Sequence, residues 1–83
     1  MLKSIEKLLD CGNDMKVGNH SSEYLYSVCS YKYFGTTICE VDYDRKKFKL
    51  PYKGMYENSN STKRAVNDYR RYFNGLGFTL VEE

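Results

Sequence analysis

The sequence predicts a single small α+β domain over residues 1–83, in which helices pack on one face of an antiparallel sheet of three to four strands. Two segments near the ends of the chain place apolar residues at helical spacing. The segment between them alternates with a period of two and is rich in aromatic and β-branched residues, as strands are. With 83 residues, the chain is too short for a second domain. We expect the element order α-β-β-β-α-β.

The first helix is predicted from four apolar residues that share one helical face: Leu2, Ile5, Leu8 and Leu9. Gly12 follows Cys11 as an expected left-handed C-cap. Residues 12–22 are rich in Gly, Asn, Asp and Ser. They are predicted to be a loop that contains a brief extended piece from Met15 to Val17.

The first strand is predicted at residues 24–34, with Gly35 supplying the turn that follows. One of its faces carries Leu25, Ser27, Cys29, Tyr31 and Tyr33, and the other carries Tyr24, Tyr26, Val28, Ser30 and Lys32. Because both faces hold aromatic residues, the alternation does not identify the buried one. The two faces carry the tyrosine pairs Tyr24 and Tyr26, and Tyr31 and Tyr33. A core this small cannot bury both pairs, so at least one pair is expected at the surface or under a loop.

Residues 36–43 and 46–50 are predicted as the second and third strands, joined by a tight turn at Asp44 and Arg45. The core side of the second strand is expected to carry Thr37, Cys39, Val41 and Tyr43, and its wetter side Thr36, Ile38, Glu40 and Asp42. In the third strand, Phe48 and Leu50 are expected inward, and Lys47 and Lys49 outward. Pro51 ends the strand because proline cannot donate to the ladder.

The second helix is predicted from six residues at helical spacing: Ala65, Val66, Tyr69, Tyr72, Phe73 and Leu76. Ser59 or Ser61 is expected to cap its start, and Gly75 or Gly77 to end it. A last short strand is expected at residues 78–81.

The composition is that of an ordinary soluble domain, with 41% hydrophobic and 29% charged residues. No segment approaches the roughly 18–20 apolar residues of a membrane span, and the N-terminus lacks the apolar region of a signal peptide. We therefore expect a cytoplasmic protein that does not contact membranes. The three cysteines, Cys11, Cys29 and Cys39, form no CxxC pair and are expected to be reduced.

The net charge of +2 conceals a segregation of charge along the chain. Residues 45–71 hold nine basic and two acidic residues, whereas residues 1–44 hold four basic and seven acidic ones. The nine are predicted to contact phosphates or an acidic protein surface: Arg45, Lys46, Lys47, Lys49, Lys53, Lys63, Arg64, Arg70 and Arg71. The alternative is that they form the solvated faces of a helix and of an edge strand, where lysine discourages edge-to-edge pairing.

Tyrosine is unusually abundant, with nine residues, and there is no tryptophan. Tyr43, Tyr69 and Tyr72 are expected in the core. The other six are predicted to form a partner-binding surface on the first strand and in the loop after Pro51: Tyr24, Tyr26, Tyr31, Tyr33, Tyr52 and Tyr56. Exposed tyrosines are rigid amphipathic anchors for protein contact, and they also stack on nucleic-acid bases.

No catalytic motif is present, because the chain contains no nucleophile elbow, glycine-rich phosphate loop or paired metal-ligand motif. The carboxylates of Glu40, Asp42 and Asp44 recur every second residue but are expected on the wet side of a hairpin. His20 has no evident partner in the sequence. We expect no enzymatic activity, no catalytic residue, no cofactor and no metal.

Three segments of the chain resemble small phage-encoded proteins over residues 30–80. They are Gly35-Thr36-Thr37-Ile38, the turn Asp44-Arg45, and the basic helix start Ser59-Asn60-Ser61-Thr62-Lys63-Arg64. Many small phage proteins inhibit host defences, and anti-CRISPR proteins are among them. The resemblance implies an inhibitor in the host cytoplasm that occupies the surface of a host protein or ribonucleoprotein complex, such as a Cas effector.

The chain also looks like a double-stranded RNA-binding domain. The match lies in the order α-β-β-β-α and in Ser61-Thr62-Lys63-Arg64-Ala65-Val66-Asn67 at the start of the last helix. That family grips phosphates with basic residues at the start of its second helix. Lys63 and Arg64 occupy this position, so nucleic-acid binding is the alternative function. A third alternative is an adaptor that completes its thin core by forming a homo-oligomer.

Overall fold

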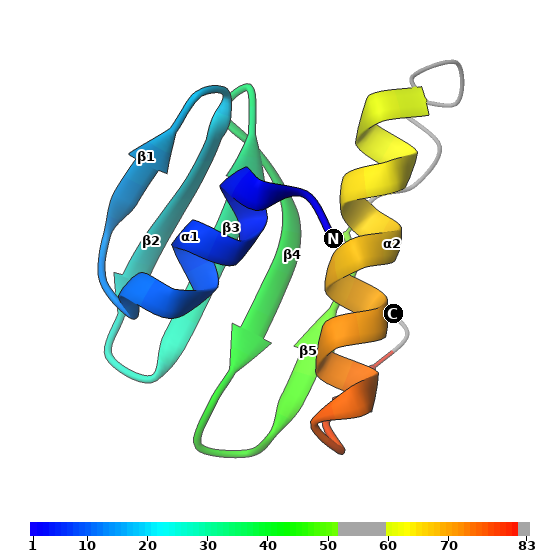
Figure 1. Ribbon diagram of the computed structural model, residues 1–83. Helices are drawn as coiled ribbons and strands as arrows, with labels where there is room; N and C mark the ends of the chain where they lie inside the picture. The colour runs from blue at the N-terminus through cyan, green and yellow to red at the C-terminus, as the bar shows by residue number, and fades with distance from the viewer. Residues whose placement is uncertain (52–59, 82–83) are drawn as a thin grey trace.

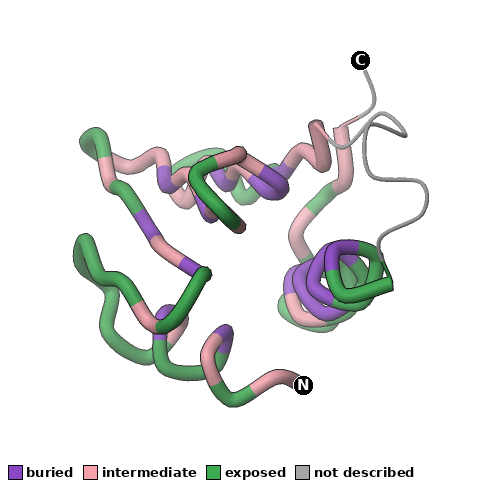
Figure 2. The backbone as a smooth tube through the Cα atoms, turned by 90° about the horizontal axis from the view of Figure 1, so that it is seen from above, coloured by how far each residue is buried: buried purple, intermediate pink, exposed green. Residues whose placement is uncertain are grey.

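In the described part of the chain, six strands form one sheet, and both helices lie against the same face of it (Figures 1 and 2). The computed structural model describes residues 1–51 and 60–81. The elements are α1 (Lys3–Cys11), β1 (Met15–Val17), β2 (His20–Leu25), β3 (Val28–Tyr33), β4 (Thr36–Asp42), β5 (Lys47–Lys49), α2 (Asn60–Gly75) and β6 (Thr79–Leu80). The predicted α+β class is confirmed.

The strands are arranged in chain order, and β1 to β5 form an antiparallel meander. The expectation of three to four strands, all antiparallel, is wrong in two respects. Among the described residues the sheet has six strands, and β6 runs parallel to β5. Parallel neighbours need a crossover connection, and α2 lies in the connection between these two strands. The helix therefore covers the sheet face beside the strands that it joins.

The predicted strand at residues 24–34 is two strands, because the chain turns at Tyr26 and Ser27. Tyr26 adopts a left-handed backbone, with φ of 57°, which no sequence signal such as glycine announces. Residues 20–22, predicted as loop, belong to β2. The turn reverses which side chains share a face, so Tyr24 lies opposite Cys29, on the same face as Tyr31.

A β-bulge in β4 corrects the predicted faces of the next strand. The register passes from Tyr31 opposite Cys39 to Lys32 opposite Thr37, so Ile38 is the extra residue. Ile38 and Cys39 are consequently both buried, at 1% and 0% exposure, although strict alternation assigns them to opposite faces.

The core lies between the helix-covered face of the sheet and the inner sides of α1 and α2. Its buried residues are Ile5, Leu8, Cys29, Tyr31, Ile38, Cys39, Val41, Phe48, Ala65, Val66, Tyr69 and Phe73. Figure 2 shows the buried side of α2 turned toward the sheet. The sheet face that no described helix covers, here named the open face, carries alternate residues such as Lys32, Glu40 and Lys49.

Local signals at the ends of the helices were informative. Gly12 follows α1 with φ of 68°, which confirms the predicted left-handed cap. α2 ends at Gly75, and Leu76 lies beyond it with 53% of its surface exposed, so its predicted place on the buried helix face is wrong. Ser61 lies inside the first turn of α2, and Ser59 falls outside the described residues.

Candidate functional site

Two of the six predicted contact tyrosines are held in a hydroxyl cluster against the core. Tyr31 has 0% exposure, and its hydroxyl oxygen lies 2.6 Å from that of Tyr43 and 3.4 Å from that of Tyr24. The ring of Tyr31 also packs 4.9 Å from that of Tyr69. Tyr31 is thus not on the surface, which corrects its prediction as an exposed anchor. Tyr24 is half-buried because the turn at Tyr26 folds it back over the same face.

The buried hydroxyls predict a loss of stability in alkali. Burial raises the pKa values of Tyr24, Tyr31, Tyr43 and Tyr69 above 10.0. The unfolded chain ionises its tyrosines near pH 10, so these groups stabilise the folded state fully below that pH and progressively less above it. We expect cooperative unfolding above about pH 10, at which the buried hydroxyls ionise together.

This alkaline transition is measured by tyrosinate ultraviolet absorbance together with circular dichroism. Tyr31→Phe removes one of the protons released on unfolding. Above about pH 10, the free energy of unfolding of Tyr31→Phe should therefore fall less steeply with pH than that of wild type, by about 1.4 kcal/mol per pH unit. Equal slopes for Tyr31→Phe and wild type in that range would contradict the prediction.

The remaining predicted tyrosines differ in exposure. Tyr26 is 96% exposed at the tip of the β2–β3 hairpin. Tyr33 is half-buried, and its hydroxyl donates to the Oγ of Ser61 at 3.1 Å. Tyr52 and Tyr56 lie outside the described residues. The expected tyrosine surface therefore reduces, in the described part of the chain, to Tyr26 and the exposed parts of Tyr24 and Tyr33.

The predicted basic residues fall into two groups on different sides of the molecule, rather than on one strip. The first group lies on β5 and on the turn before it: Arg45, Lys46, Lys47 and Lys49. The second lies on α2: Lys63, Arg64, Arg70 and Arg71. β5 directs Lys47 and Lys49 to the open face, whereas α2 lies against the opposite face (Figure 1). Lys53 is outside the described residues.

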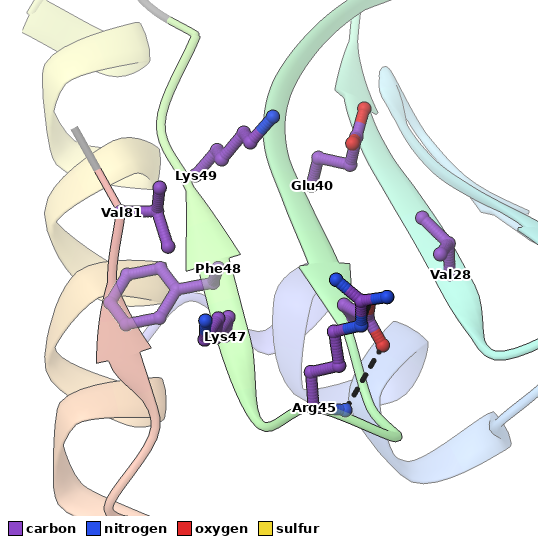
Figure 3. A pocket seen from close by; sticks show the side chains of 8 residues that line it. Val28, Glu40, Arg45, Lys47, Phe48, Lys49 and Val81 are labelled. Carbon is purple, nitrogen blue, oxygen red and sulfur yellow. Dashed lines mark hydrogen bonds and ion pairs between the residues drawn. The ribbon is translucent and has the colours of Figure 1, made fainter. Parts of the chain in front are cut away.

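The β5 group lies among carboxylates. Lys47 is paired in register with Asp42, and Lys49 with Glu40. The backbone N–H of Arg45 donates to Oδ1 of Asp42 at 3.1 Å, and its Nε lies 3.9 Å from Oδ2. These side chains border a hollow of about 280 Å³ on the open face (Figure 3). The two carboxylates partly offset the cations beside them, which weakens the attraction of the open face for a polyanion.

The α2 group has no such balance. The side of α2 turned away from the core, here named the basic face of α2, carries Lys63, Arg64, Asn67, Arg70, Arg71 and Asn74, all exposed. The single acidic residue of the helix, Asp68, is buried and accepts a hydrogen bond from the backbone N–H of Leu2 at 2.9 Å. Within residues 1–51 and 60–81, no carboxylate forms an ion pair with these four cations.

Aromatic rings gather at the end of the sheet next to the start of α2. The ring of Tyr33 stacks on His20 at 4.5 Å and lies 4.6 Å from that of Phe34. A cavity of about 390 Å³ there is lined by Leu2, His20, Tyr33, Asn60, Ser61 and Arg64. His20 is 9% exposed, and burial lowers its pKa below 6.5, so its ring is neutral at pH 7.

The cysteines are free thiols, with Cys11 exposed and the other two buried in the core. Burial raises the pKa values of Cys29 and Cys39, which disfavours their reactive thiolate forms. No three His, Cys, Asp or Glu side chains among the described residues come together as metal ligands. In the same part of the chain, neither helix combines the length and apolar character needed to cross a bilayer.

The chain matches no known family model, no curated protein and no solved structure. The resemblances to phage proteins and to double-stranded RNA-binding domains therefore stay predictions.

Proposed function

We propose that this protein is a non-enzymatic binding protein whose basic face of α2 contacts the phosphate backbone of a nucleic acid. The proposal rests on one observation. The exposed side of α2 carries four cations, and the one carboxylate of the helix is buried. A solvated surface helix normally mixes charges of both signs, because opposite charges three or four residues apart stabilise it.

The spacing of these cations suits a repeating phosphate chain. Lys63 and Arg64 form one pair, and Arg70 and Arg71 form a second pair seven residues later in α2. Seven helical residues rise about 10 Å, so the two pairs address phosphates separated along the ligand. Asn67 lies between the two pairs, and Asn74 follows the second pair. Amide side chains donate hydrogen bonds to phosphates and to base edges. Asn67 also accepts a hydrogen bond from Nη1 of Arg70 at 3.2 Å, which orients that guanidinium.

A second candidate is the phage-encoded inhibitor of a host nuclease complex expected from the resemblance. The observation that favours it is Tyr26, which is 96% exposed with φ of 57°. A large aromatic side chain in this conformation adds nothing to the core, and left-handed backbone in a non-glycine residue carries a cost. Co-purification with a defence nuclease, lost in Tyr26→Ala, would support this candidate, whereas unchanged recovery of the complex would remove Tyr26 from its contact surface.

The nucleic-acid proposal is tested by fluorescence anisotropy with labelled oligonucleotides at several salt concentrations. Duplex DNA, duplex RNA and single strands of equal length are compared. Each phosphate contact contributes about −0.9 to the slope of log affinity against log salt for duplex DNA and about −0.7 for single strands. Four contacts therefore predict slopes of about −3.6 and about −2.8. Absence of binding to all three at about 50 mM salt, or a flat salt dependence, would overturn the proposal.

A further inference from the structure

Phe34 is an exposed aromatic residue whose backbone conformation is unfavourable for a bulky side chain. It forms the two-residue turn between β3 and β4 with Gly35, and both residues have positive φ, 50° and 78°. Such turns favour Asn-Gly, because a bulky side chain is strained at φ near +50°. Yet the side chain of Phe34 is 68% exposed. The fold thus gains little from this ring, and a strained exposed residue points to a role outside the fold.

The ring of Phe34 is supported from behind. Tyr33 lies 4.6 Å from it and is fixed by stacking on His20 at 4.5 Å and by its hydroxyl bond to Ser61. Ser61 belongs to the first turn of α2, next to Lys63 and Arg64. These contacts join the exposed aromatic ring to the start of the basic face of α2. Arg64 also lines the cavity of about 390 Å³ that His20 and Tyr33 border.

The charged residues around Phe34 determine on which side of it an anionic ligand binds. On its other side lies a hollow of about 620 Å³ whose lining includes Asp14, Glu23 and Lys16, and Glu23 also pairs with Lys32 at 3.1 Å. Charges of both signs offset one another there, so a polyanion that contacts Phe34 is favoured on the α2 side. The cations of α2 attract it along the same path.

We propose that the nucleic acid is single-stranded, with an unpaired base stacked on Phe34 and the neighbouring phosphates bound by Lys63 and Arg64. This inference rests on the proposed function and names its ligand class. The face of a base is available to an aromatic side chain where the base is unpaired, and such stacking tolerates any sequence. A duplex would occupy the cations of α2 without using Phe34.

Tyr26 provides a matched control. It is also an exposed aromatic residue with positive φ, but it lies at the opposite end of β3, and no other ring packs against it in the described part of the chain. Asparagine tolerates the left-handed conformation, so Phe34→Asn and Tyr26→Asn should both fold at least as well as wild type. Thermal unfolding of each variant checks this before binding is measured.

The experiment measures the affinity of each variant for a labelled oligothymidine and for a duplex of equal length by fluorescence anisotropy. Phe34→Asn is expected to bind the single strand about tenfold more weakly, as for loss of one stacked base, with its duplex affinity unchanged. Its salt slope should match that of wild type, because the phosphate contacts remain. Phe34→Tyr should bind as wild type does, and Tyr26→Asn should change neither affinity.

The outcomes separate the two proposals. Salt-dependent binding that is the same in Phe34→Asn and wild type would overturn stacking and leave the basic face of α2 as the nucleic-acid contact. An equal loss for single strand and duplex would also overturn it. If wild type binds no oligonucleotide at low salt, the proposed function fails and this inference fails with it.

Discussion

Phe73→Ala is expected to lower the free energy of unfolding by about 3–5 kcal/mol, the usual cost of deleting a buried aromatic ring. Phe73 has 0% exposure and lies at the centre of an aromatic cluster. Its ring centroid lies 5.0 to 6.1 Å from those of five neighbours. The separations are 5.0 Å to Tyr72, 5.4 Å to Phe78, 5.7 Å to Phe48, 6.1 Å to Tyr31 and 6.1 Å to Tyr43. These neighbours come from β3, β5, α2 and the segments beside them, so the ring joins α2 to the sheet.

The size of this effect matters because small domains have little stability to lose. A chain of this length is stabilised by about 4–12 kcal/mol in total, at roughly 0.05–0.15 kcal/mol per residue. Urea unfolding followed by circular dichroism measures the change. Leu76→Ala is the matched control, since Leu76 follows the same helix but is 53% exposed, and it should change stability by less than about 1 kcal/mol. A loss below about 1 kcal/mol in Phe73→Ala would contradict the packing described here.

Neutralising the basic face of α2 is expected to have the largest effect on binding. Arg70→Gln with Arg71→Gln removes two phosphate contacts, so the salt slope for duplex DNA should fall in magnitude by about 1.8. Adding Lys63→Gln and Arg64→Gln should abolish the electrostatic part of binding. Glutamine suits this test because its helix propensity is close to those of lysine and arginine, so α2 should remain folded.

The β5 cations give the control for this experiment. Lys47→Gln with Lys49→Gln removes the same charge as the Arg70 and Arg71 pair, but from positions opposite Asp42 and Glu40. We expect the slope to change by much less than 1.8, because these lysines face carboxylates instead of a free surface. Equal effects of the two double variants would show that net charge alone, and not the basic face of α2, governs binding.

Much of the local structure could be predicted because its signals lie close together in the sequence. The 3.6-residue spacing of Ala65, Val66, Tyr69 and Phe73 identifies the buried side of α2, and Gly12 marks the end of α1. The burial of Phe48 and the outward position of Lys47 follow from alternation in a short strand without irregularities.

The face of each strand residue was predicted less well, since one extra or turning residue reverses the alternation. The turn at Tyr26 and Ser27 has no glycine or proline to announce it, and it places Tyr24 beside Tyr31 over the core. The bulge at Ile38 depends on how β4 pairs with β3, which is a non-local property. Phe34 is predicted as the last residue of a strand and not as part of a candidate surface, whereas the structure places it in the turn before β4. The phenylalanine directly before Gly35 was a usable signal for this turn.

The sequence by itself determined the α+β class, the two helices with their buried sides, and the concentration of basic residues after position 44. Periodicity and composition are properties of neighbouring residues in the chain, so they do not depend on how the helices and strands are arranged in space. Only the tertiary structure decided that Tyr31 is buried, that β6 runs parallel to β5, and that the basic residues divide between the open face and α2. These outcomes depend on which distant strands pair and on which sheet face the helices cover, because pairing and packing join residues that the sequence keeps far apart.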